Sequence, residues 1–191
     1  MNRSLLMVLL VLAISTGSEA AGAQKARATK SEARPSTISV SDLTTPVLKE
    51  IQDIEERTVA IAEDFPNDLY NSYRPKGDSD VRSAAEILLH IAEQNQSYAS
   101  LMRTKQQQEA LIASGKKPSA KEILTYASKP DTVAKVKASF AAVREAIQGN
   151  PDPEKLKFWL YIIAHSHGHF GNLVTYYREN GLVPPTSRQR R

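Results

Sequence analysis

The stretch PEKLKFWLYIIAHSHGHFGNLVTYYRENG, residues 153–181, shows how this chain folds. Its apolar residues recur every three or four positions, as they do on one face of an α-helix, and no strand-type alternation interrupts them. Pro153 suits the first turn of a helix, and Gly181 suits the position just past its end. The stretch therefore predicts one long amphipathic helix.

Three further long helices are predicted upstream from the same spacing of apolar residues and from capping and breaking residues. Their expected ranges are 41–65, 79–112 and 130–149, with candidate N-caps at Ser41-Asp42 for the first and at Ser79 or Asp80 for the second. A short extra helix is expected at about 119–126, between helices 2 and 3. Four long helices with long connections favour an all-α fold, a four-helix bundle.

The first 23 residues have the pattern of a secretory signal peptide. Arg3 is followed by an apolar run over 5–14 and by small residues that end at Ala23. That run is too short to cross a bilayer, which takes about 20 residues of helix. We expect an exported chain, periplasmic or secreted, with no integral membrane association after cleavage at 1–23. A retained anchor is the alternative.

The charge is unevenly distributed along the chain. The net charge is +4, but residues 24–36 and 188–191 together carry +6, which leaves −2 on residues 37–187. We therefore expect a disordered basic linker at 24–40, the bundle at 41–185 and a basic C-terminal tail at 186–191. A nucleic-acid partner is disfavoured, because binding needs basic residues gathered on a folded face. The lack of cysteine excludes disulfides and thiolate metal sites.

The histidines are the candidate chemistry-bearing residues. On a helix His165 and His169 lie about 40° apart, whereas His167 lies about 200° round from His165. His90 stands in an apolar stretch of the second helix. Three imidazoles buried without partners would cost about 1–3 kcal/mol each, and a divalent cation would supply those partners. Spacing alone leaves two interpretations open, a metal site and a set of core histidines with other partners.

Two segments resemble a known family. HSHGHFGN at 165–172, followed by YRENGLVPP at 177–185, resembles the end of the DinB-like family, whose last helix reads H-x3-H-R-G-Q and closes with Y-x-R-x-x-G-x-x-P-P. RPKG at 74–77 and AAEILLHIA at 84–92 resemble that family's loop and second helix. The resemblance covers about 43–185.

The resemblance implies a four-helix bundle, often a homodimer, that holds one divalent ion through His90, His165 and His169. Zinc or nickel are the leading candidates. Some members of the family that the chain resembles transfer or isomerise substrates with thiols such as bacillithiol or mycothiol, and an exported chain would lack those cytosolic thiols. Phe170 stands where the family has Arg and Asn172 where it has Gln, so the pattern predicts that a charged or long amide group beside the site is missing.

We expect a metal-dependent transferase or hydrolase with an unknown small-molecule substrate. The alternative is a non-enzymatic metal-binding or scaffold bundle with a structural or vestigial site. Two weak candidates for a catalytic role are Glu86, one turn before His90, and Tyr176, near the histidine face. Glu86 is either a partner or base at the site or a solvated carboxylate, and Tyr176 is either catalytic or packed. We expect His167 at the surface or the rim of the site.

Overall fold

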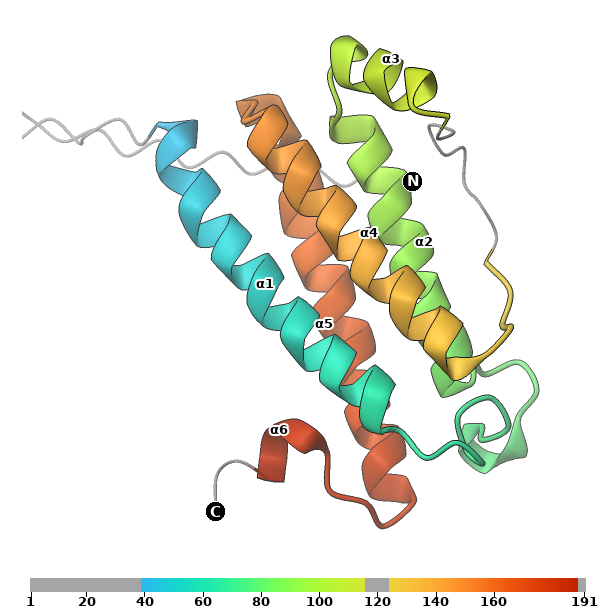
Figure 1. The fold of residues 1–191 in the computed structure, drawn as a ribbon. Helices are drawn as coiled ribbons and strands as arrows, with labels where there is room; N and C mark the ends of the chain where they lie inside the picture. The colour runs from blue at the N-terminus through green and yellow to red at the C-terminus, as the bar shows by residue number, and fades with distance from the viewer. Residues whose placement is uncertain (1–38, 116–123, 189–191) are drawn as a thin grey trace, which may run out of the picture. The chain divides into compact units, whose positions relative to one another are not determined.

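The computed structural model describes residues 39–115 and 124–188, which fold into helices with short connections (Figure 1). The helices are α1 (Val40–Asp64), α2 (Ala84–Met102), α3 (Lys105–Ala113), α4 (Lys129–Gly149), α5 (Leu156–Glu179) and α6 (Pro185–Arg188), with 3-10 turns η1 (Pro75–Gly77) and η2 (Pro153–Lys155). The described ranges contain no strand, so the predicted all-α class is confirmed. None of their helices has the length and apolar character needed to cross a membrane.

The four long helices α1, α2, α4 and α5 pack side by side as the predicted bundle (Figure 1). α1 and α5 run in the same direction, since Glu50 and Asp64 of α1 contact His167 and Tyr177 of α5 in that order. α2 and α4 run together in the opposite direction (Figure 1). The connection from α2 to α4 must therefore return along the length of the bundle, which is why it is much longer than a hairpin.

The core lies between the apolar faces of these helices. Burying each Ile or Leu side chain stabilises the fold by about 1.5–3 kcal/mol. Aromatic rings close the end of the bundle where α1 and α5 finish, and Phe65 meets Tyr177 edge to face with ring centroids 4.9 Å apart. The largest side chains that are fully buried are Trp159, Tyr70, Tyr177, Phe65, Phe140, Ile51, Ile54, Ile61, Leu88, Ile91, Met102 and Ile147.

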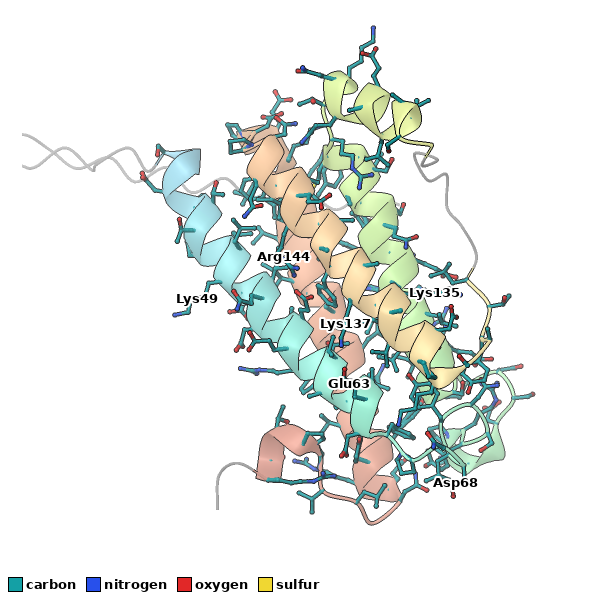
Figure 2. All side chains as sticks on the ribbon, viewed as in Figure 1. Lys49, Glu63, Asp68, Lys135, Lys137 and Arg144 are labelled. Atoms are coloured by element: carbon teal, nitrogen blue, oxygen red, sulfur yellow. The ribbon has the colours of Figure 1, made fainter. Side chains whose placement is uncertain are left out.

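Ion pairs join α1 to α4 on the outside of the bundle. Lys137 Nζ donates to Glu63 Oε1 at 2.7 Å, and the two side chains point toward one another in Figure 2. Arg144 of α4 pairs with Glu55 of α1, about two helical turns before Glu63. An exposed pair such as Lys137–Glu63 contributes about 0–1 kcal/mol, so the apolar core contributes far more than this pair to holding the two helices together.

Two helices begin at residues other than the predicted caps. Ser39 caps α1 through a capping box with Asp42, so the helix starts before the expected Ser41-Asp42. Ser83 caps α2 through the same motif with Glu86, later than the expected Ser79 or Asp80. In both cases the residue three positions after the cap has a carboxylate that accepts a hydrogen bond from the backbone N–H of the capping serine, while the serine hydroxyl accepts one from the backbone N–H of that residue. These two hydrogen bonds determine where the helix begins.

The second predicted helix is two helices in the structure. α2 ends at Met102 because Arg103 is extended, with ψ of 145°, and Thr104 then caps α3 through a box with Gln107. α3 is thus the extra short helix between the second and third long helices. The expected position at 119–126 differs: Leu124 and Tyr126 are not helical, and residues 116–123 lie outside the described residues.

The ends of the chain are only partly described. The predicted signal peptide at 1–23 and most of the predicted linker at 24–40 lie outside the described residues, and Ser39 and Val40 belong to the start of α1. The predicted tail at 186–191 begins inside α6. Arg188 there donates two hydrogen bonds to Asp64 of α1, at 3.0 and 2.8 Å. A forked guanidinium pair of this kind gives a basic residue a fixed place on the fold.

Candidate metal centre

Three histidines come together between α2 and α5. His90 lies on α2, His165 and His169 lie one turn apart on α5, and the two helices run in opposite directions. His165 Nε2 is 3.2 Å from His90 Nε2, and the three ring centroids are 4.5–5.0 Å apart. One ring nitrogen from each lies within 4.8 Å of the other two. The structure thus gathers the residues that spacing and resemblance singled out.

Burial keeps two of these imidazoles neutral. It lowers the pKa of His165 and of His169 to about 4, and the positive charge of Arg82 and of the neighbouring histidines acts in the same direction. Both rings are therefore uncharged at neutral pH and keep a nitrogen lone pair. Neutral imidazole is the form that binds a metal ion.

The same two rings carry buried nitrogens without a partner. The Nδ1 atoms of His165 and His169 are inaccessible to solvent, and no described residue offers either a hydrogen bond. Each such atom costs about 1–3 kcal/mol. Three converging nitrogen donors fit a divalent cation with open positions. The nitrogens that meet include Nε2 of His90 and of His165, so an ion bound there would not supply the missing partner of His165 Nδ1.

Glu93 lies beside the site and was not among the site residues predicted from the sequence. Its Oε2 lies 3.7 Å from His90 Nδ1, and its Oε1 accepts a hydrogen bond from the backbone N–H of Leu124 at 2.6 Å. At 3.7 Å the carboxylate is too far from Nδ1 for a hydrogen bond, but its negative charge favours a ring orientation with Nδ1–H turned toward it. The signal was present in the sequence, because Glu93 follows His90 by three residues and shares its side of the helix.

Glu86 is engaged elsewhere. Arg74 donates to both of its carboxylate oxygens, at 2.5 and 2.8 Å, and the backbone N–H of Ser83 donates to it at 2.8 Å. The hydrogen bonds from Arg74 are the main reason that the pKa of Glu86 falls to about 2. A carboxylate stabilised in this way is a weak base, and it serves to start α2 and to hold the preceding loop.

Tyr176 is buried, and its hydroxyl already has a partner. The hydroxyl donates to the backbone carbonyl of Arg82 at 2.8 Å, and the ring meets Tyr73 edge to face at 5.5 Å. Burial raises the pKa of the Tyr176 phenol. Tyr176 therefore anchors the residue before the α2 cap to α5, two turns beyond His169.

The remaining residues of the histidine segment face other parts of the molecule. His167 lies toward α1, where its Nε2 is 2.8 Å from Glu50 Oε1. Phe170 lines a surface hollow with Ala60 and Val174, so the family's Arg position faces α1 here. The expectation that a charged or long amide group is missing beside the site stays a prediction. Asn172 is exposed.

Comparison with known sequences agrees with this arrangement. The profile of the DinB family matches residues 40–190, which includes the bundle and all three histidines. No curated protein matches the chain, and no solved structure matches it.

Proposed function

Because the chain belongs to the DinB family, we propose that it binds one divalent metal ion through His90, His165 and His169. The observation that carries the proposal is the convergence of three imidazoles from two helices, with one nitrogen of each within 4.8 Å of the others. Neutral His165 and His169 supply lone pairs without losing a proton. Imidazole donors suit zinc, nickel, cobalt and copper, and we propose zinc or nickel as the ion.

We propose that the site serves a transferase or hydrolase reaction. The ion, when bound by three protein ligands, supplies Lewis acidity at its open positions. The chain's own residues would orient the ligands: Glu93 places a negative charge behind the ring of His90, and the apolar faces of α2 and α5 keep the imidazoles in place. We further propose that residues 1–23 direct export, so that the protein acts on a small molecule outside the cytoplasm, where a cytosolic thiol is not its co-substrate.

A non-enzymatic metal-binding bundle is the second candidate, and a specific observation favours it. The two acid–base candidates have other partners: Glu86 is ion-paired with Arg74, and the Tyr176 hydroxyl donates to a backbone carbonyl. If neither Glu86 nor Tyr176 acts as an acid or base, the ion would serve structure. Catalysis would then need an acid or base supplied by the substrate.

Elemental analysis of protein purified without a histidine tag tests metal binding. We expect about one equivalent of zinc or nickel in the wild type and less than about 0.2 equivalents in His165→Ala. His167→Ala is the matched control, because His167 lies on the same helix but pairs with Glu50, and it should retain the ion. Equal and low metal content in all three proteins would overturn the proposal.

A further inference from the structure

A row of aromatic rings leads away from the histidine site. It consists of Phe158 and Tyr161 on α5 and Tyr98 on α2, and we call it the aromatic ladder. The Tyr161 ring lies nearly parallel to His165, at 18° and with centroids 5.5 Å apart. Tyr98 lies 4.4 Å from Tyr161, and Phe158 lies 5.6 Å from Tyr98. The first ring of the ladder therefore touches one of the three candidate metal ligands.

The ladder differs from the aromatic residues of the core. Trp159 and Tyr177 on the same helix are fully buried, whereas Tyr161 is 42% exposed. Phe158, Tyr161 and His165 follow one another at spacings of three and four residues, so they share one face of α5. Tyr98 comes from α2, two turns beyond His90. Tyr161 is thus an exposed ring that lies directly beside the three-histidine site, with the partly buried rings of Tyr98 and Phe158 next to it.

The far end of the ladder is positively charged. Lys155 Nζ lies 5.8 Å and Lys157 Nζ 5.1 Å from the centroid of the Phe158 ring. Ammonium groups over an aromatic face stabilise its position. Phe158 is therefore held at its place by charge as well as by Tyr98, and Tyr161 is the ring that offers surface between the lysines and the histidines.

We propose that the substrate of this site carries a planar ring that packs against Tyr161 and Tyr98 while its reacting group reaches the three histidines. This inference rests on the proposed metal site. Aromatic rings recognise other rings by offset stacking or edge-to-face contact, with a gain beyond the area that is buried. The order of the rings along the helices fixes the expected shape of the substrate: a metal-binding group at one end and a planar ring next to it.

The test uses cobalt-loaded protein and three hydroxamates that share one chelating group. Acetohydroxamate lacks a ring, benzohydroxamate carries a planar ring, and cyclohexanecarbohydroxamate carries a ring of similar size that is not planar. Binding is followed by the change in the visible absorption of cobalt. In the wild type we expect benzohydroxamate to bind about tenfold more tightly than either of the others.

Variants at Tyr161 separate the ladder from the metal site. In Tyr161→Ala the preference for benzohydroxamate should fall to about onefold to twofold, with cobalt content and acetohydroxamate affinity unchanged, and Tyr161→Phe should restore the preference. Leu160→Ala is the matched control, since Leu160 is the neighbouring residue on α5, is 55% exposed and lies about 100° round the helix from Tyr161. It should leave the preference unchanged.

The outcomes distinguish the two proposals. Cobalt binding with equal affinity for all three hydroxamates, or a preference that survives Tyr161→Ala, would overturn the ring inference and leave the metal site standing. Equal binding of the planar and non-planar rings would show that Tyr161 offers only an apolar surface, which also overturns it. A wild type that binds no cobalt would overturn the metal site and the ring inference together.

Discussion

The carboxylate of Glu93 lies 3.7 Å from His90 Nδ1 and so stands behind the one histidine that α2 contributes to the site. The same carboxylate is only 13% exposed and also accepts the N–H of Leu124, so its position is set from two sides. The negative charge of Glu93 therefore favours the orientation of His90 in which Nε2 faces His165.

Glu93→Gln should weaken metal binding by about 10–100-fold. The amide oxygen still accepts the Leu124 N–H, but the negative charge behind His90 is gone. A competition titration of zinc with a chromophoric chelator measures the effect. Glu109→Gln, which removes an exposed carboxylate paired only with Lys105, is the control. An unchanged dissociation constant in Glu93→Gln would show that the carboxylate does not support the site.

Arg82→Gln should raise the pKa of His165 and His169 in the metal-free protein. Arg82 lowers both values, though burial is the larger cause, so they should rise from about 4 but remain below 6.5. Titration of the imidazole signals by NMR measures the change. Arg178→Gln removes an equal charge elsewhere on the surface and should leave both values alone; the same rise in this variant would rule out a local effect of Arg82.

Metal-free protein should lose stability as the pH falls from about 7 toward 4. The folded-state pKa values of His165 and His169, about 4, lie below the ordinary value of 6.5, so the unfolded chain takes up protons first. Their contribution is complete above pH 6.5 and is lost as the pH approaches 4. Glu86, with a pKa of about 2 against 4.5, contributes to the loss only below pH 4.5.

Urea unfolding at several pH values separates these contributions. Between pH 6.5 and 4.5 the free energy of unfolding should fall less steeply in His165→Leu than in the wild type, because one of the two titrating rings is gone. The comparison is between slopes, so a general change in stability caused by the substitution does not affect it. Identical slopes would mean that His165 titrates normally in the folded protein.

Ser83→Ala should destabilise the fold by about 1 kcal/mol, because Ser83 accepts the backbone N–H of Glu86 at the start of α2. Asp80→Ala, at a cap expected from the sequence, should change stability by less than about 0.5 kcal/mol. The midpoints of urea unfolding compare the two variants directly. A larger loss in Asp80→Ala would place the start of α2 earlier than Ser83.

The bundle and its histidines were predictable because their signals are local. Apolar residues at helical spacing gave the four long helices, and Pro130 and Gly181 marked boundaries that α4 and α5 respect within one or two residues. His165 and His169 share a face whatever the tertiary structure. His90 was a candidate because it stands in an apolar stretch of its helix, and the resemblance to the DinB-like family then favoured a metal site over core histidines.

The start of α2, the break before α3 and the role of Glu93 could not be predicted. They depend on tertiary contacts, or on which of several similar capping residues forms the cap. Several residues could cap α2, and only the reciprocal bond between Ser83 and Glu86 decides among them. The apolar spacing continues through Arg103, so it gives no sign of the break before α3. Glu93 and Glu86 flank His90 almost symmetrically in sequence, and their roles differ because Arg74 reaches one and Leu124 the other.

Glu93 also links the connection between α2 and α4 to the histidine site, through its contact with Leu124. One oxygen of this carboxylate faces His90 and the other holds the backbone of Leu124, so the two contacts share a single rigid group. Thermodynamic linkage is reciprocal: if the Leu124 contact raises the affinity for the ion through Glu93, the bound ion stabilises the Leu124 contact by the same free energy. Amide hydrogen exchange at Leu124 should therefore slow when the metal binds, and the backbone N–H of Leu124 would report the occupancy of a site to which Leu124 supplies no ligand.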